Sequence, residues 1–191
     1  MQIRIRRARR SDSTNPTRIA HAAKRHWGYP ETLIRLWKAE LTLTPELVVR
    51  QPVYCAVSAS RVVGFYALSD RGATPELEHM WVRPTHMASG VGRSLFSHLL
   101  KQLHAMGAVR LRIASDPNAE GFYRRMGARR VGRVPSRPAG RYLPLLVVDP
   151  RRVPASGISM RVRRLRSRRA ACCLERSTLA WRHPRESGAR N

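Results

Sequence analysis

Residues 76–103 read ELEHMWVRPTHMASGVGRSLFSHLLKQL. The first part, 76–83, is rich in apolar and aromatic residues and ends at Pro84, which favours a strand. A loop that contains Gly90 and Gly92 follows it. Leucines then recur at helical spacing and fall on one face, at Leu95, Leu99, Leu100 and Leu103. The stretch therefore predicts a strand, a glycine-rich loop and a helix in direct succession.

The glycine loop suits an anionic ligand. Glycine lets the backbone come close to a bound group, and the free N–H groups at a helix start favour negative charge. Arg93 and Ser94 add side-chain donors. A pyrophosphate is the natural ligand of such a loop, although a plain strand–helix connector accounts for the same two glycines.

Two common phosphate-binding loops match this stretch only in part. A dinucleotide-binding loop needs a third glycine, and Leu95 stands at that position. A Walker-type loop needs Gly-Lys followed by Ser or Thr, and Gly92-Arg93-Ser94 resembles only its end. Neither match is good enough to assign the loop to one of these classes.

Strand and helix signals continue on both sides of the stretch. Before it we expect an edge strand at 2–8, helices at 16–26, 33–41 and from Thr44, and a hairpin of strands 53–58 and 61–69. After it we expect a strand at 109–115, a helix at 119–126, and strands at 128–134 and 142–148 joined by a loop at 135–141. The pattern predicts an α/β fold.

Three motifs in this order resemble the GNAT superfamily of acyl-CoA-dependent N-acetyltransferases. They are Val82-Arg83-Pro84, the loop 87–92, and Asn118 followed by Tyr123 and Gly127. The resemblance covers roughly residues 2–149. Met87 departs from it, because Gln or Arg is usual there. The resemblance implies a mixed, mostly antiparallel, twisted sheet flanked by helices, in which strands 76–83 and 109–115 run parallel and splay to form a CoA cleft.

The resemblance also implies an activity and a cosubstrate. The enzyme would transfer an acetyl group from acetyl-CoA to a primary amine, which attacks directly in a ternary complex, with no metal. The pantetheine arm would lie along the strand at Met80, Trp81 and Val82, where a backbone N–H would polarise the thioester carbonyl. The remaining cofactor-binding residues would be Met87 (through its backbone N–H), Ala88, Ser89, Gly90, Val91, Gly92, Arg93, Ser94, Asn118, Phe122 and Tyr123.

Two glutamates and one tyrosine are the candidate catalytic groups. An amine arrives protonated at neutral pH, so a base must accept its proton. Glu76 matches the family position best, and Glu78, two residues on and expected on the same side, is the second choice. Tyr123 would protonate the departing thiolate. Each of the three also has a purely structural interpretation, and His79, on the opposite parity, is expected to be structural.

The acceptor is a small-molecule or peptide amine whose identity no motif reveals. Trp27, Tyr29 and Trp37 lie in the segment that covers the acceptor site in this family. They either line an apolar pocket or fix the helices to the sheet, and both interpretations stay open. The oligomeric state is equally open between monomer and homodimer.

The charge is strongly positive. Lys and Arg total 37 against 12 acidic residues, for a net charge of +25, and all but Lys24, Lys38 and Lys101 are arginines. Residues 150–191 form an Arg-rich tail, which we expect to be disordered and separate from the acetyltransferase domain at 1–149. Such a charge attracts nucleic acid non-specifically. The alternative function is therefore a basic, nucleic-acid-associated module with a degenerate acyl-CoA site.

Several protein classes find no support in the sequence. No stretch approaches the 18 or so consecutive apolar residues of a membrane-spanning helix. The basic N-terminus has no apolar run behind it, so we expect a cytoplasmic protein. Cysteines 55, 172 and 173 fit neither a disulfide framework nor a zinc-site spacing.

Overall fold

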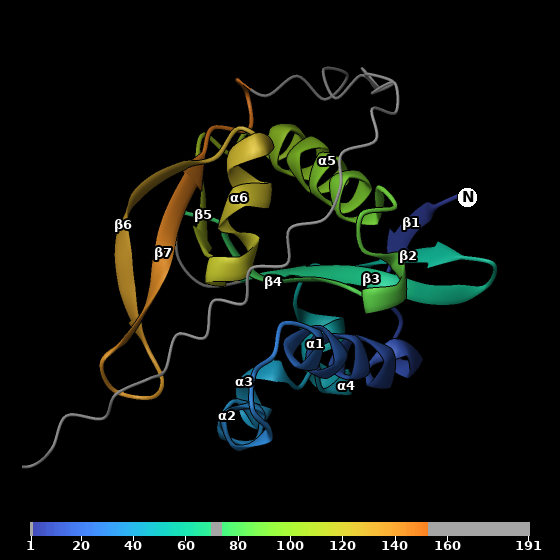
Figure 1. Ribbon diagram of the computed structural model, residues 1–191. Coiled ribbons are helices and arrows are strands. Elements are labelled where there is room, and N and C mark those ends of the chain that lie inside the picture. The colour runs from blue at the N-terminus through green and yellow to red at the C-terminus, as the bar shows by residue number, and fades with distance from the viewer. Residues whose placement is uncertain (1, 70–73, 153–191) are drawn as a thin grey trace, which may run out of the picture. The chain divides into compact units, whose positions relative to one another are not determined.

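The fold is built on one twisted sheet of seven strands (Figure 1). The computed structural model describes residues 2–69 and 74–152, all within one compact unit. The strand order across the sheet is β1-β2-β3-β4-β5-β7-β6. The strands are β1 (Arg4–Arg7), β2 (Val53–Ser58), β3 (Arg61–Leu68), β4 (Glu76–Val82), β5 (Leu111–Ala114), β6 (Arg129–Ser136) and β7 (Arg141–Val148).

Strands β4 and β5 form the one parallel pair of this sheet. They pair only at Glu76–Arg112 and Leu77–Ile113. From there to Val82, β4 is bonded to β3 alone, so the two parallel strands separate towards their C-terminal ends. The mixed, mostly antiparallel sheet with a splayed parallel pair, expected from the sequence, is confirmed.

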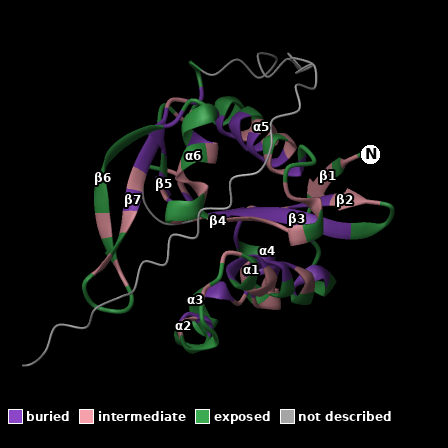
Figure 2. Ribbon diagram, in the orientation of Figure 1, coloured by how far each residue is buried: buried purple, intermediate pink, exposed green. Residues whose placement is uncertain are grey.

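Helices cover the sheet on both faces (Figure 1). On one face lie α5 (Val91–Ala105) and α6 (Pro117–Arg125). On the other lie α1 (Thr14–His26), α2 (Glu31–Leu36), α3 (Lys38–Leu41) and α4 (Pro45–Arg50), with two short 3₁₀ turns, η1 (Arg10–Asp12) and η2 (Pro84–His86), elsewhere in the chain. Two apolar clusters, one per face, form the core, and the buried side of each helix faces the sheet (Figure 2).

Helix α5 packs unusually close to β3 because of Gly64. A Cβ atom at Gly64 would lie 2.9 Å from the carbonyl oxygen of Trp81 and 3.1 Å from side-chain atoms of both Val91 and Leu95. Only a residue without a side chain fits there. This close approach sets the start of α5 directly against the separating part of β4.

Two elements differ from the sequence-based expectation. The single helix expected at 33–41 is broken at Trp37, whose backbone (φ −90°, ψ 10°) ends α2 and begins α3. The loop expected at 135–141 is shorter, because Pro135 pairs with Tyr142 and Ser136 with Arg141, which leaves only residues 137–140 as the turn. The Arg141 guanidinium also donates to the Ser136 hydroxyl at 2.7 Å, which joins the two strands at the end of this hairpin.

Three other expectations concern the C-terminal tail, membrane-spanning helices and metal sites. The Arg-rich tail lies outside the described residues from position 153 on, so its order and the domain boundary near Asp149 stay predictions. Within residues 2–69 and 74–152, no helix has the length and apolar character needed to cross a bilayer. The same ranges hold no cluster of His, Cys, Asp and Glu suited to a metal ion.

Candidate active site

Residues 87–94, called the phosphate loop below, comprise the turn before α5 and the first turn of that helix. Gly90 adopts φ +90° and caps the helix, and the N–H of Ser94 makes the first bond back to its carbonyl. The N–H groups of Val91, Gly92 and Arg93 therefore have no acceptor inside the helix. Nothing lies within 4 Å of a Cβ placed on Gly90, so the backbone is open to a ligand at this point.

Other residues of the phosphate loop shape its turn. The N–H of Met87 donates to the carbonyl of Pro84 at 3.1 Å, so the donor expected to meet a phosphate is already used within the chain. Ala88 has a positive φ of 59°, and the Ser89 hydroxyl donates to the His86 carbonyl at 2.7 Å. The N–H groups at 91–93 are without a described acceptor, and the side chain of Arg93 is exposed.

The three motifs named in the sequence converge at Gly92. A Cβ at this position would lie 3.5 Å from the ring of Phe122 on α6 and 3.7 Å from the side chain of Val82 on β4. Met80 and Val82 pack towards the α5 cluster, while Trp81 packs on the α1 face. The phosphate loop, the separating part of β4 and helix α6 thus surround one site.

Tyr123 lies buried on α6 beside this site, with 5% of its surface exposed. Its ring is 5.2 Å from Phe122 and 5.8 Å from Phe96. Burial, with a smaller effect from the charge of Asp116, raises its pKa, so the phenol is neutral at pH 7. Among the described residues its hydroxyl has no hydrogen-bond partner, which leaves the O–H available to a ligand.

The candidate bases Glu76 and Glu78 lie in different surroundings. The pairing of β4 with β3 shifts at Glu78, and Leu77 and Met80 pack on the same cluster, so the regular alternation assumed for the strand is broken there. The Glu78 carboxylate accepts from the side-chain amide of Gln51 at 3.0 Å. Glu76 is partly buried at the start of β4, and no described side chain bonds its carboxylate.

His79 has a structural contact on the α1 face. Its Nδ1 accepts from the indole N–H of Trp81 at 3.3 Å, and its ring is 6.1 Å from Phe65. Burial lowers the pKa of His79 to about 4, so the ring is neutral at pH 7 and carries its proton on Nε2. His79 holds the Trp81 side chain in place.

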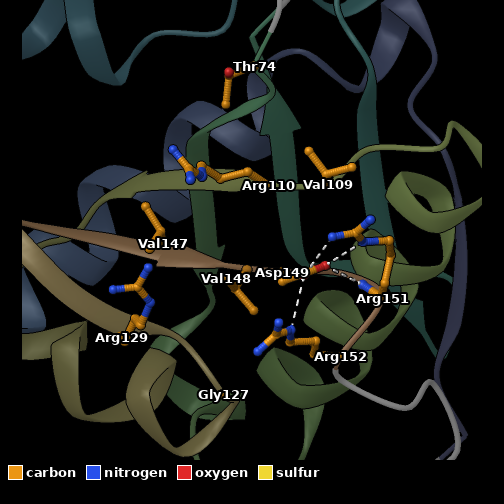
Figure 3. Close-up of a pocket in the computed structure, with 10 residues that line it drawn as sticks. All are labelled: Thr74, Val109, Arg110, Gly127, Arg129, Val147, Val148, Asp149, Arg151 and Arg152. Atoms are coloured by element: carbon orange, nitrogen blue, oxygen red, sulfur yellow. Dashed lines mark hydrogen bonds and ion pairs between the residues drawn. The ribbon is translucent and has the colours of Figure 1, made fainter.

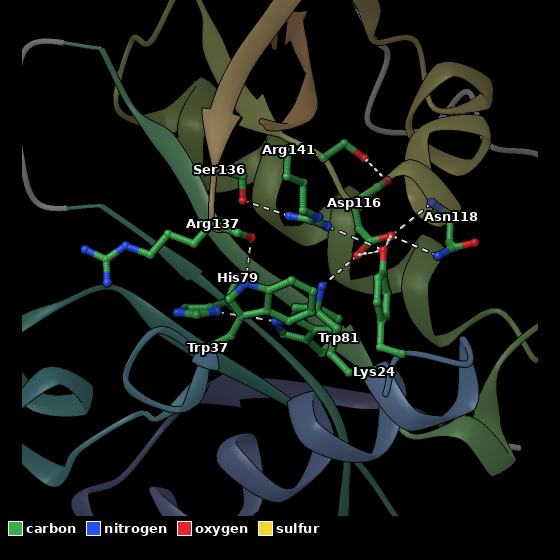
Figure 4. Close-up of polar contacts among 11 residues, drawn as sticks. Lys24, Trp37, His79, Trp81, Asp116, Asn118, Ser136, Arg137 and Arg141 are labelled. Carbon is green, nitrogen blue, oxygen red and sulfur yellow. Dashed lines mark hydrogen bonds and ion pairs between the residues drawn. The ribbon is translucent and has the colours of Figure 1, made fainter. Parts of the chain in front are cut away.

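A buried lysine lies where β4 and β5 separate (Figure 4). Lys24 of α1 forms an ion pair with Asp116 at 2.7 Å, and 8% and 7% of the two side chains are exposed. The Lys24 ammonium lies 4.5 Å from the ring centres of Tyr29 and Trp37 and 5.3 Å from that of Trp81. Burial lowers the pKa of Lys24, and the charge of Asp116 opposes this. We call these five residues the Lys24 cage.

Asp116 connects the Lys24 cage to the motif residues on α6. Its carboxylate caps the helix by accepting from the backbone N–H of Asn118 at 2.9 Å and from the Asn118 side chain at 3.1 Å. The Tyr29 hydroxyl donates to the same carboxylate at 3.1 Å. Asn118, expected to contact pantetheine or to cap the helix, is thereby held at the helix start.

The β6–β7 hairpin closes the other side of the Lys24 cage (Figure 4). The Trp37 indole N–H donates to the backbone carbonyl of Arg137 at 2.9 Å. The Arg141 guanidinium lies 4.7 Å from the Trp37 ring centre and reaches the Tyr29 hydroxyl at 3.5 Å. Trp27 is more remote, with its ring 5.7 Å from Trp81. Tyr29 and Trp37 therefore both face the site and fix the helices to the hairpin.

Sequence reasoning missed three residues of this cluster. Lys24, Asp116 and Arg141 are not among the site residues that the sequence predicts. Lys24 does have one sequence signal, because lysine is rare in this arginine-rich chain. The compact ammonium of a lysine suits a small buried space better than the larger guanidinium. No sequence pattern marks Arg141, because Tyr29 and Trp37, which its guanidinium contacts, lie far from it in the sequence.

A basic hollow of about 530 Å³ lies at the opposite end of β4 and β5 (Figure 3). Its lining includes Arg110, Arg129, Arg151 and Arg152. Asp149 bonds Arg151 at 3.0 Å and pairs with Arg152 at 3.5 Å. Arg110 directly precedes β5, and Arg129 begins β6, so the hollow is remote from the phosphate loop and the Lys24 cage.

The comparisons with known proteins agree with this arrangement. A family model described as an acetyltransferase (GNAT) domain matches residues 46–146, more than half of the chain. No curated protein matches the sequence.

Many solved structures share the fold. A PaiA N-acetyltransferase from Thermoplasma acidophilum, in complex with coenzyme A, is 19% identical with a TM-score of 0.65, over 78% of this chain and 99% of that one. A GCN5-related N-acetyltransferase from Rhodopseudomonas palustris is 20% identical with a TM-score of 0.66, over 78% and 96%. The yncA protein from Salmonella typhimurium, with its cofactor acetyl-CoA, is 18% identical with a TM-score of 0.56, over 78% and 94%. Together with the matching domain, the splayed strands and the phosphate loop identify this chain as a member of the GNAT acetyltransferase family.

Proposed function

We propose that the protein is an N-acetyltransferase that moves an acetyl group from acetyl-CoA to a primary amine by direct attack. One observation carries the proposal: the phosphate loop, the separating part of β4 and helix α6 meet around Gly92. Family membership supports acyl transfer, and the arrangement of the residues supports the amine acceptor and the direct route.

The binding side of the proposal fits the residues present. The open N–H groups at 91–93 and the exposed Arg93 would hold the pyrophosphate, at a helix start that favours negative charge. The backbone of Met80, Trp81 and Val82 would pair with the pantetheine arm as an added strand does. When bound there, acetyl-CoA supplies an acetyl thioester that is open to attack.

The chemical steps are assigned to groups of this chain. Glu76 accepts the proton of the incoming ammonium, with Glu78 as the second choice because Gln51 already bonds its carboxylate. A backbone N–H near Val82 donates to the carbonyl oxygen as negative charge develops on it. Tyr123 donates its phenolic proton to the sulfur that leaves, and the second proton lost by the attacking nitrogen restores the phenol. The new amide bond forms as the thioester bond breaks, so no covalent enzyme intermediate is required.

The alternative, a nucleic-acid-associated module, rests on the net charge of +25 and the basic hollow. Binding measurements at different salt concentrations distinguish the two functions. Acetyl-CoA should stabilise an acetyltransferase at moderate salt, because it binds only the folded state. Specific nucleic-acid binding should instead persist well above physiological salt, where non-specific binding through phosphate contacts is lost.

The direct test is acetyl-CoA-dependent thiol release with a panel of amines, for the wild type and Tyr123→Phe. The variant should bind acetyl-CoA as before and turn over about 10- to 1,000-fold more slowly, the scale expected for a lost general acid. Tyr142→Phe is the matched control, since Tyr142 is 47% exposed and its ring packs against Arg133, which has no assigned role. Equal turnover in wild type and Tyr123→Phe contradicts the assigned role.

A second pair of variants ranks the two glutamates. Glu76→Gln should lower turnover with a protonated amine and alter the pH–rate profile, because the proton acceptor is lost. Glu78→Gln should have the smaller effect. If Glu78→Gln alone reproduces the loss, the base is Glu78.

A further inference from the structure

Arg141 is the one cation beside the Lys24 cage that no described carboxylate neutralises. Its contacts are the Ser136 hydroxyl at 2.7 Å, the Tyr29 hydroxyl at 3.5 Å and the face of Trp37. All three are neutral groups. They fix the guanidinium in place while leaving several of its N–H donors unused.

Neighbouring charges do not compensate Arg141. The Asp116 carboxylate is already engaged by Lys24 at 2.7 Å and by the Tyr29 hydroxyl. The Glu40 carboxylate pairs with Arg137 at 3.9 Å. The cluster therefore keeps one net positive charge, on a partly buried and oriented guanidinium.

The ammonium of an acceptor has no place inside the aromatic cage. Rings that face a cation are a common recognition site for amines, but here the Lys24 ammonium already occupies the space between Tyr29, Trp37 and Trp81. The group on this side of the site that lacks a partner of opposite charge is the Arg141 guanidinium, and its N–H donors suit an anion.

The position of Arg141 relates this donor to the acyl site. Trp81 belongs to the part of β4 that has left β5, and Asp116 caps the helix that carries Tyr123. Arg141 starts β7, which is bonded to β5, and its guanidinium points over Trp37 towards Asp116 (Figure 4). An acceptor held at Arg141 would thus lie beside the region where β4 and β5 separate.

We propose that the acceptor is an amine that also carries a carboxylate, and that Arg141 binds this carboxylate through paired N–H donors. The inference rests on the proposed function, because it names the substrate class of the same site. A guanidinium matches a carboxylate in two parallel hydrogen bonds, which an uncharged amide of the same shape cannot replace.

The test compares free amino acids with their carboxamides, which share the amine and the side chain. With saturating acetyl-CoA, kcat/KM should be at least about tenfold higher for the acid, mainly through KM. β-Alanine and its carboxamide form a second pair, in which the acid should again be the better acceptor. Acids and amides used equally well would overturn the proposal.

Variants assign the preference to one residue. Arg141→Gln should remove the higher kcat/KM of the acid and leave kcat/KM of the amide unchanged. Arg141→Lys should keep part of the advantage of the acid, since a lysine retains the charge without the paired N–H donors of a guanidinium. Arg137→Gln is the control, because that side chain is exposed and should change neither substrate. A loss that Arg141→Gln inflicts equally on acid and amide would show a structural role and contradict the proposal.

Binding measurements separate this inference from the function on which it rests. Calorimetry with CoA-loaded protein should detect the acid and not the amide, and Arg141→Gln should abolish that signal. If acetyl-CoA binds but no carboxylate probe does, the inference is wrong and the acetyltransferase assignment stands. If acetyl-CoA does not bind at all, the proposed function fails, and titration of the acids into the free protein decides the role of Arg141.

Discussion

The two sides of the separating strands are built in different ways. On the cosubstrate side, the phosphate loop, Val82 and helix α6 lie within a short stretch of sequence, and each has a local pattern. On the acceptor side, the contacts join residues far apart, 92 positions for Lys24–Asp116 and 100 for Trp37–Arg137. If the proposed sites are right, we expect cosubstrate binding to depend on local backbone geometry and acceptor choice to depend on how distant elements pack.

Breaking the Lys24–Asp116 pair should give the largest loss of stability. Lys24→Met leaves a buried carboxylate without its cation, which should lower the free energy of unfolding by about 3–5 kcal/mol in denaturant titrations. Lys38→Met, at an exposed position, is the control and should cost little. The double variant Lys24→Met/Asp116→Asn should recover part of the loss, since asparagine still caps α6. No recovery would contradict an ion-pair origin.

On the cosubstrate side, Gly64→Ala tests the close packing of α5. The added methyl group would lie 2.9 Å from the backbone oxygen of Trp81, so the helix or β4 must shift, at a cost of about 1–3 kcal/mol. Gly132→Ala is the matched control in β6, where a Cβ meets nothing within 4 Å. Equal unfolding free energies for the two variants would show that the contact is relaxed easily.

His79 should make the acceptor side sensitive to acid. Its pKa is about 4 in the folded protein and about 6.5 when unfolded, so the unfolded chain binds the proton first. Stability from this group is complete above pH 6.5 and is lost as the pH falls towards 4. Between pH 7 and 5 the wild type should lose about 1–2 kcal/mol more than His79→Asn, whose side-chain oxygen can still accept from Trp81. Parallel pH profiles would argue against this assignment.

Removing the residues after Arg152 should have the smallest effect on the site. Every residue assigned to acetyl-CoA or to the acceptor lies before that point, so acetyl-CoA affinity and turnover should be essentially unchanged. The truncation removes ten arginines and should weaken non-specific RNA retention and its salt dependence. Loss of acetyl-CoA binding would show that the site extends beyond residue 152.

The fold was largely predictable from the sequence, and the reason is local patterning. Leucine periodicity fixed α5, and the motif residues from Val82 to Gly127 placed the parallel strands. The break at Trp37 and the long β6–β7 hairpin were not predictable, because both depend on contacts between the two segments, such as the bond from Trp37 to Arg137.

The same distinction between local sequence patterns and long-range contacts applies to the residues of the candidate site. Gly90 and Tyr123 have sequence signatures, and the structure brings their elements together. Met87 shows the limit of such signatures, since its N–H is used by Pro84 and only the backbone geometry reveals this. Lys24 stands out in the sequence only as a rare lysine and Arg141 not at all, because their roles arise from a charge balance that exists only in the folded chain.

Acetyl-CoA should bind at the open helix start after Gly90, and calorimetric titration of three proteins tests this. Gly90 and Gly107 lie at the two ends of α5, both at positive φ and both with no atom within 4 Å of a Cβ. Valine at either position should therefore strain the backbone to a similar degree. Acetyl-CoA should bind the wild type and Gly107→Val with similar affinity, and Gly90→Val should show no binding heat. Equal binding by the two variants would contradict a binding site at the helix start after Gly90.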